Sequence, residues 1–231
     1  MKKILAYSLL IACMSAPLSA NAFDLSNLNL LNKNKKQDVV ENKFTPVNED
    51  SMLQTLAQLK SQIASTDSAA QNSFLSIVSA LASKDEFESI ATKLNSIVGD
   101  ATLTDSYKTN EINSIITKFT SGILVNQGYV KNAISNMSYT QKMQLLSNFK
   151  TLANCGSKYA NIAQQYLNMS SYMSTTSTNI PSISANSATI KSNATSLLGR
   201  VAAIKDLITQ VSGISKTVGF SGIGSVLNLI K

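Results

Sequence analysis

The chain has 231 residues, no histidine, 20 Lys and Arg residues against 13 Asp and Glu residues, and a formal net charge of +7. Without imidazole it lacks the usual general base and the commonest metal ligand, which excludes Ser-His and Cys-His nucleophile systems and His-based metal sites. The one tight acidic cluster, Asp85, Glu86 and Glu88, opens an expected helix, where acids favour the positive end of the dipole. We therefore expect a protein that is not an enzyme, with no catalytic residue, cofactor or metal.

The first 22 residues have the order of a secretory signal peptide: two lysines, a short apolar run, and small residues up to Ala20 and Ala22. We expect cleavage before Phe23 by a bacterial Sec-type route, and residence in the periplasm or outside the cell. The apolar run around Cys13 also resembles the lipobox of bacterial lipoproteins. That cleavage leaves a signal shorter than the usual range of roughly 15 to 30 residues, so a lipid anchor through Cys13 is the alternative.

Cleavage before Phe23 leaves Cys155 as the one cysteine of the mature chain. A lone thiol makes no internal disulfide, so the fold must be stable without one. Cys155 lies in an expected helix beside Gly156, and we interpret it as a small buried apolar residue rather than a reactive thiol.

Residues 23–48 are expected to form a flexible leader with a short apolar segment, because the stretch FDLSNLNLL precedes a basic polar run and a proline. After it, apolar residues recur at spacings of four and three, which indicates one face of a helix. This block covers about residues 51–98 and ends at Gly99. Ser68 and Ser83 each begin a capping-box pattern, so each either restarts a helix or lies inside a longer one.

A second seam of four-residue and three-residue steps runs from Ile112 to Met137 and predicts one coiled-coil-like helix. Asn126 is its one polar member, and it either fixes the register of the seam or is partly exposed near Gly128. A further capping box at Ser138 begins the next helix. In that helix one row of residues is large and seven apart: Leu145, Leu152, Tyr159, Tyr166 and Met173. In the companion row the side chains become small after the first residue, which allows close approach of a partner helix. This row is Phe149, Gly156, Ala163 and Ser170.

Residues 174–182 are a loop by composition, and the segment after them has the most regular pattern of the chain. Its main row repeats every seven residues: Ile183, Ile190, Leu197, Ile204, Val211 and Val218. The short loop predicts that this helix folds back on the preceding one as an antiparallel hairpin. We therefore expect an all-α fold over residues 51–218, an elongated antiparallel bundle of about four long helices with coiled-coil-like heptad seams.

Charge is distributed unevenly along the mature chain. Residues 23–111 carry eight Lys against twelve acids, whereas residues 112–231 carry nine Lys and one Arg against a single acid. A basic half of this kind attracts anionic partners at low salt. Outside the cytoplasm these are lipid head groups, cell-envelope polymers or acidic proteins rather than nucleic acid.

The C-terminal segment, residues 219–231, is glycine-rich and too apolar for a solvated tail. It either docks on the bundle or inserts against a partner or a membrane interface. The candidate residues for partner or membrane contact are Phe220, Ile223, Val226, Leu227, Leu229 and Ile230.

Two functions follow as expectations. The first is an exported, non-enzymatic helical interaction protein, a scaffold, adaptor or chaperone-like binder that contacts a protein partner or a second copy of itself. The alternative is a membrane-active or lipid-binding helical protein, similar to pore formers in architecture alone, which uses its apolar termini and basic half on an anionic membrane or envelope polymer.

Overall fold

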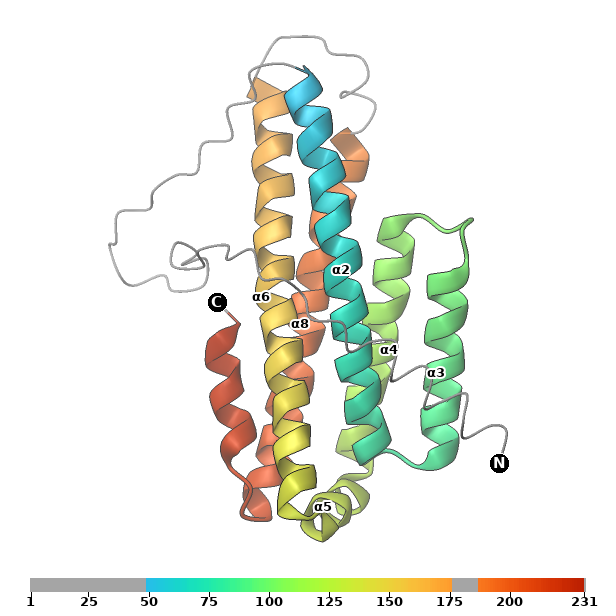
Figure 1. The fold of residues 1–231 in the computed structure, drawn as a ribbon, viewed down its shortest axis with the longest axis vertical. Helices are drawn as coiled ribbons and strands as arrows, with labels where there is room; N and C mark the ends of the chain where they lie inside the picture. The colour runs from blue at the N-terminus through green and yellow to red at the C-terminus, as the bar shows by residue number, and fades with distance from the viewer. Residues whose placement is uncertain (1–48, 176–186, 231) are drawn as a thin grey trace. The chain divides into compact units, whose positions relative to one another are not determined.

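The computed structural model describes residues 49–175 and 187–230 (Figure 1). These residues belong to one of two units of the chain, Glu41–Lys231. Of the described residues 91% are helical, in seven helices and no strand, so the all-α class is confirmed. Several expectations lie outside the described residues: the signal peptide with Ala20, Ala22 and Phe23, the lipobox with Cys13, the leader at 23–48, and most of the loop at 174–182.

The predicted block at 51–98 forms two helices, α2 (Glu49–Leu81) and α3 (Lys84–Gly99). The chain turns between them at Ser83, whose hydroxyl accepts a hydrogen bond from the Glu86 N–H at 3.3 Å. This bond satisfies one of the free N–H groups at the start of α3, as the capping-box pattern predicts. α3 packs beside α2 and α4 at one flank of the fold (Figure 1).

The structure decides one open helix boundary and corrects another. Ser68 lies inside α2, so its capping-box pattern starts no new helix. α3 does end at Gly99, but the capping residue is Asp100, whose backbone is extended. Its carboxylate accepts the N–H of Thr102 at 2.8 Å. A glycine that caps a helix usually does so with a positive φ, and Gly99 has none. The expectation that Gly99 itself caps the helix is therefore wrong.

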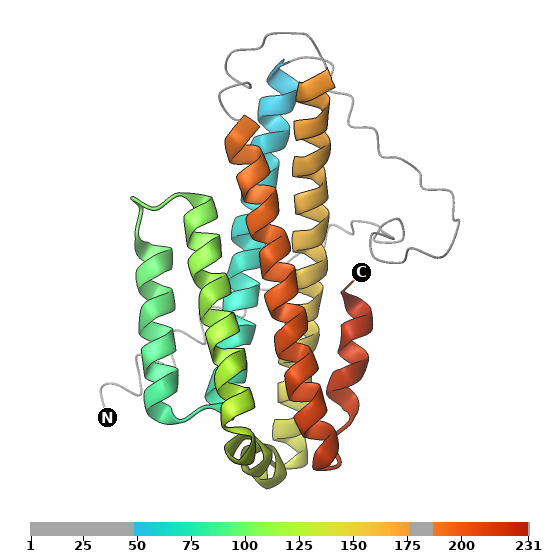
Figure 2. The same cartoon turned by 180° about the vertical axis from the view of Figure 1, so that it is seen from behind.

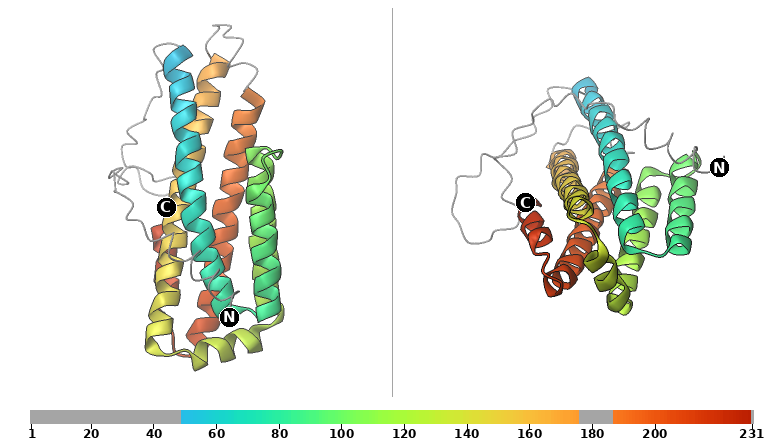
Figure 3. Two further views of the ribbon diagram at one scale, coloured as in Figure 1. Left: turned by 45° about the vertical axis from the view of Figure 1, so that its right-hand side comes forward. Right: turned by 60° about the horizontal axis from the view of Figure 1, so that its bottom comes forward.

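The expected single helix from Ile112 to Met137 is wrong, because the chain breaks at Asn126. α4 covers Asp105–Val125 and α5 covers Gln127–Asn136. Between them Asn126 has φ −107° and ψ 36° and is exposed, so it fixes no seam. Asn and the nearby glycine at position 128 are both weak helix formers, which makes this a favourable place for the break. α5 then crosses the end of the fold instead of extending α4 (Figure 3).

The two longest helices of the second half are α6 (Tyr139–Thr175) and α8 (Ser187–Thr217). The capping box at Ser138 is confirmed in both directions: the Ser138 N–H donates to Gln141 Oε1 at 2.8 Å, and the Gln141 N–H donates to Ser138 Oγ at 3.2 Å. α6 and α8 run antiparallel and pack together (Figure 2). α2 packs on α6, and α4 packs on α8.

The chain reverses direction after α8 because Gly219 adopts φ +75°. Residues other than glycine rarely adopt this backbone conformation. The N–H of Phe220 donates to the Ser215 carbonyl at 2.9 Å, and the N–H of Gly219 donates to the Lys216 carbonyl at 3.2 Å. These two bonds form a Schellman motif. The following 3₁₀ helix, η2 (Gly222–Leu229), therefore packs back on α6 and α8.

The apolar C-terminal segment is docked on the helices rather than presented to solvent. Ile223, Val226 and Ile230 are buried, and the Ile230 side chain covers Gly156 of α6. The hydroxyl of Ser157 donates to the Leu229 carbonyl. Of the six residues expected to contact a partner or membrane, Leu229 is exposed, whereas Phe220 and Leu227 are half-buried against the core. The close approach that the small row of α6 allows is thus made at Gly156 by Ile230, the residue that follows η2.

Candidate functional site

Arg200 is the single arginine of the chain, and it is one of the most deeply buried side chains that the structure describes. α8 carries it inward on the row of residues that also holds Leu207 and Ile214, both buried. A guanidinium group keeps its charge at any physiological pH, so its burial requires partners. Those partners come from three other helices.

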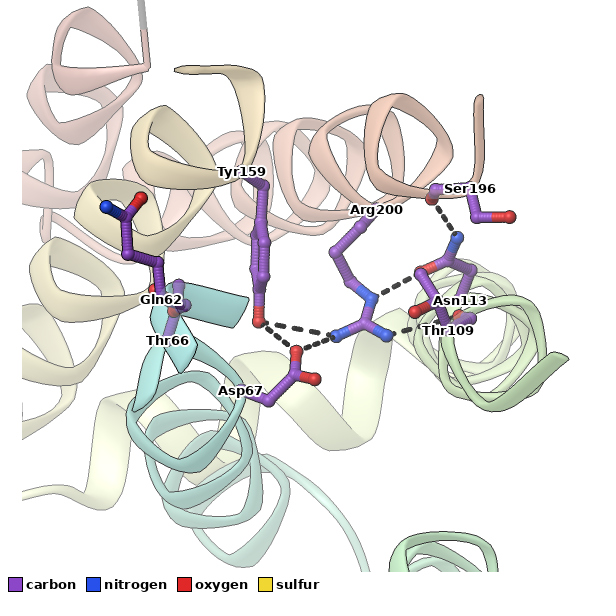
Figure 4. A network of polar contacts seen from close by, with 8 residues as sticks. All are labelled: Gln62, Thr66, Asp67, Thr109, Asn113, Tyr159, Ser196 and Arg200. Atoms are coloured by element: carbon purple, nitrogen blue, oxygen red, sulfur yellow. Dashed lines mark hydrogen bonds and ion pairs between the residues drawn. The ribbon is translucent and has the colours of Figure 1, made fainter. Parts of the chain in front are cut away.

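The guanidinium of Arg200 contacts four residues (Figure 4). Its Nη1 lies 3.2 Å from Asp67 Oδ1 on α2 and donates to the Tyr159 hydroxyl oxygen on α6 at 3.5 Å. Its Nη2 donates to the Thr109 carbonyl on α4 at 3.2 Å, and its Nε donates to Asn113 Oδ1 on the same helix. The planar fork of arginine makes this possible, because it directs several N–H groups outward at fixed angles.

The partners of Arg200 are also bonded to one another. The Tyr159 hydroxyl donates to Asp67 Oδ1 at 2.6 Å, and the guanidinium carbon lies 5.4 Å from the centre of the Tyr159 ring. The side-chain nitrogen of Asn113 donates to the Ser196 carbonyl at 2.9 Å. We call the residues Asp67, Thr109, Asn113, Tyr159, Ser196 and Arg200 the Arg200 network.

Burial keeps the Tyr159 phenol of the network protonated. Desolvation raises the pKa of Tyr159 above its ordinary value, and the negative charge of Asp67 raises it further. The phenol therefore stays protonated and donates its hydrogen bond across the physiological range. Asp67 is one quarter exposed, so water reaches one edge of the network. Each charged or titratable group of the network is engaged by another, an arrangement suited to holding helices in register rather than to reaction with a substrate.

A second polar level lies one heptad from the first. Because α6 and α8 are antiparallel, Tyr166 comes level with Asn193 just as Tyr159 comes level with Arg200. The Tyr166 hydroxyl is buried and has no hydrogen bond of regular geometry within the described part of the chain. Burial raises its pKa, and nearby Asn193 opposes that shift more weakly.

Cys155 is buried on α6, as expected. Desolvation raises the pKa of its thiol to about 11, with the positive charge of Lys158 acting in the opposite direction. Only the thiolate reacts, so the buried thiol is a poor nucleophile at neutral pH.

We expect the Cys155 thiol in the folded protein at pH 8 to react with a disulfide reagent at least about 100-fold more slowly than in the urea-unfolded chain. The unfolded chain releases the thiol proton at a lower pH than the folded chain does. The associated stability is therefore complete below about pH 9 and is lost as the pH rises toward 11. Absorbance of the released reagent measures the rate, and equal rates in the two states would contradict the burial of Cys155.

The acidic cluster singled out in the sequence behaves as a helix start. Asp85 and Glu86 lie in the first turn of α3. Glu88 forms an exposed ion pair with Lys84 at 3.9 Å. Among the described residues no group of three or more Asp, Glu, Cys or His side chains is placed to hold a metal ion.

The end of α4, the helix α5 and the start of α6 lie at the same end of the fold (Figure 3). Large apolar and aromatic side chains on these segments are exposed. Val125 is 83% exposed and Tyr139 is 79% exposed. The Tyr129 hydroxyl reaches the Ala82 carbonyl at 3.3 Å and ties α5 to the end of α2. We call this set of residues the basal surface: Leu124, Val125, Tyr129, Tyr139 and Met143.

Comparison of the chain with models of protein families, with curated proteins and with solved structures finds no match. Of the helices in residues 49–175 and 187–230, none is both long and apolar enough to cross a membrane. The function is therefore argued from the side chains described above.

Proposed function

We propose that the chain is an exported, non-enzymatic helical interaction protein that binds a protein partner or a second copy of itself through the basal surface. The observation that carries this proposal is the exposure of Val125 and Tyr139, two large side chains that flank the two ends of α5. Exposed apolar residues that gather in one region are typical of protein contacts, whereas scattered ones need no explanation. Aromatic side chains are also enriched at interfaces. A scaffold, adaptor or chaperone-like binder fits this description.

The proposal includes an elongated antiparallel bundle of about four long helices, α2, α4, α6 and α8, with coiled-coil-like heptad seams. Contacts from all four helices converge on the Arg200 network, which supports a common core. The seven-residue rows of α6 and α8 are buried over most of their length, as seams require. Phe74 of α2 and Phe119 of α4 add an edge-to-face contact with ring centres 5.7 Å apart.

The non-enzymatic part of the proposal rests on how the reactive groups are used. Tyr159, Asp67 and Arg200 are bonded to one another, and the Cys155 thiol is buried and neutral. A catalytic group must instead reach the reacting atoms of a substrate.

Protein contact at the basal surface is tested by native mass spectrometry of protein purified without denaturant. We expect a complex heavier than one chain, and a chain starting at Phe23 if the signal peptide is cleaved as proposed. Substitution of Val125 and Tyr139 by Ser should release single chains. Leu198→Ser is the matched control, because Leu198 is also exposed but lies on α8 outside the basal surface. A single-chain mass for the unmodified protein, or equal release by the control, would contradict the proposal.

A membrane-active or lipid-binding role is the second candidate, favoured by the charge of the second half. No acidic residue occurs between Glu111 and Asp206. Lys118, Lys150 and Lys158 in this stretch are exposed. Such a surface attracts anionic lipid head groups or envelope polymers at low salt. Dye leakage from anionic vesicles, abolished at high salt, would favour this candidate, whereas the proposed interaction protein leaves the vesicles intact.

A further inference from the structure

A cavity of about 440 Å³ opens between the last turns of α8 and the helix η2. Hydroxyl groups, glycines, one lysine and Leu227 line it, and more of its surface is apolar than polar. The residues that matter here are Thr209, Ser212, Lys216, Ser221, Gly224 and Ser225. The two helices lie side by side because the Gly219 turn reverses the chain (Figure 2). The cavity is separate from both the Arg200 network and the basal surface.

Ser212 is the distinctive residue of this cavity. It is only 4% exposed, yet its hydroxyl makes no hydrogen bond to any residue that the structure describes. Neighbouring hydroxyls on α8 donate to carbonyls one turn earlier, as Thr209 does to Lys205 at 2.8 Å and Ser215 does to Ser212 at 3.0 Å. The Ser212 hydroxyl instead faces η2, since a Cβ added at Gly224 would stand 2.8 Å from its oxygen. Among the described residues the Tyr166 hydroxyl is the one fully buried side-chain group without a partner, so the Ser212 oxygen is open to the cavity and is a donor free to bind a ligand there.

Positive charge surrounds the same point. The ammonium nitrogen of Lys216 lies 3.7 Å from the position of that Cβ, over Gly224, and makes no ion pair within the described residues. The N-terminus of η2 adds the partial positive charge of its first N–H groups, and Ser221 makes no side-chain cap there. The nearest acid along α8, Asp206, is one turn before Thr209, and Gln210 donates to it at 3.2 Å.

We propose that this cavity binds a phosphate group, either as free phosphate or as the head of a phosphate ester such as an anionic lipid. Lys216 supplies the charge, and the Ser212 and Ser221 hydroxyls supply neutral donors. The absence of a side chain at Gly224 lets η2 approach Ser212 and Lys216 closely, so the phosphate would lie in the cavity beside these groups rather than over Gly224. Charge-assisted hydrogen bonds of this kind are the strong ones in anion sites. Phosphate oxygens accept from all of these donors at once.

Titration of the ¹⁵N-labelled protein tests the site. One arm adds inorganic phosphate and the other adds glycerol 3-phosphate, a soluble ester head group. We expect chemical-shift changes concentrated on the amides of Ser212, Lys216, Gly224 and Ser225, with a Kd of about 1 mM or tighter in at least one arm. Saturation by inorganic phosphate identifies the free anion as sufficient, and saturation by the ester alone identifies the head group as the ligand.

Two substitutions and a control make the test specific. Lys216→Gln and Ser212→Ala should each weaken binding by about tenfold, the loss expected for one charge-assisted bond. Lys191→Gln, which removes an exposed lysine near the start of α8, should leave the Kd within about twofold. Circular dichroism verifies that each variant is folded. The proposal is overturned if neither arm shifts these amides, or if the Lys191 variant binds as weakly as the Lys216 variant.

Discussion

Asp67→Ala lowers the free energy of unfolding by about 3–5 kcal/mol, because it leaves the Arg200 guanidinium buried without its carboxylate. The same change removes the acceptor of the 2.6 Å hydrogen bond from Tyr159. Breaking one partner of a buried charged pair is expected to cost more than most surface substitutions. Urea denaturation followed by circular dichroism measures the effect.

The matched control is Glu88→Ala, which removes the exposed ion pair between Lys84 and Glu88 and should change stability by at most ~0.5 kcal/mol. Arg200→Met should cost less than Asp67→Ala, since the carboxylate left behind is one quarter exposed and reaches water. If Asp67→Ala and Glu88→Ala differed by less than about 1 kcal/mol, the Arg200 network would not hold the core together.

The second large effect is expected at the C-terminal segment. Ile223→Ala should lower the free energy of unfolding by about 2–4 kcal/mol, because Ile223 is fully buried against α6 and α8 and its truncation leaves a cavity. Leu229→Ala, on the same helix but 40% exposed, should cost less than about 1 kcal/mol. Urea denaturation again gives the comparison.

Limited proteolysis provides an independent measure of the docking of η2. The Ile223 variant should be cut faster than the Leu229 variant in the turn around Gly219, since loss of a docking anchor frees that segment. Equal stability and equal cleavage of the two variants would show that the segment does not rest on α6 and α8 in solution.

The periodic apolar rows predicted the long helices because burial of one helix face leaves a regular spacing in the sequence. The capping boxes at Ser83 and Ser138 marked helix starts for a local reason: both partners of each bond lie within four residues. The break at Asn126 was missed because apolar spacing resumes after it, with Val130 and Ile134 buried on the next helix. A row of apolar residues does not reveal that the chain has changed direction.

The Arg200 network was missed for a different reason. Asp67 and Arg200 are 133 residues apart, so no pattern within one helix brings them together. Two signals were present in the sequence: the chain has one arginine among its many lysines, and that arginine shares a row with apolar residues on α8. The docking of η2 was left open in a similar way, because an apolar segment shows that it needs cover but not which surface covers it.

Site-specific photo-crosslinking at the basal surface, in the cells that make the protein, tests the central proposal most directly. A photoreactive phenylalanine analogue replaces Tyr139, which is 79% exposed, and in a separate control it replaces Leu198 on α8. The proposed interaction protein yields a crosslinked species of one defined mass from position 139 and none from position 198. Crosslinks from both positions alike, or to lipid alone from position 139, would contradict a protein contact at this surface.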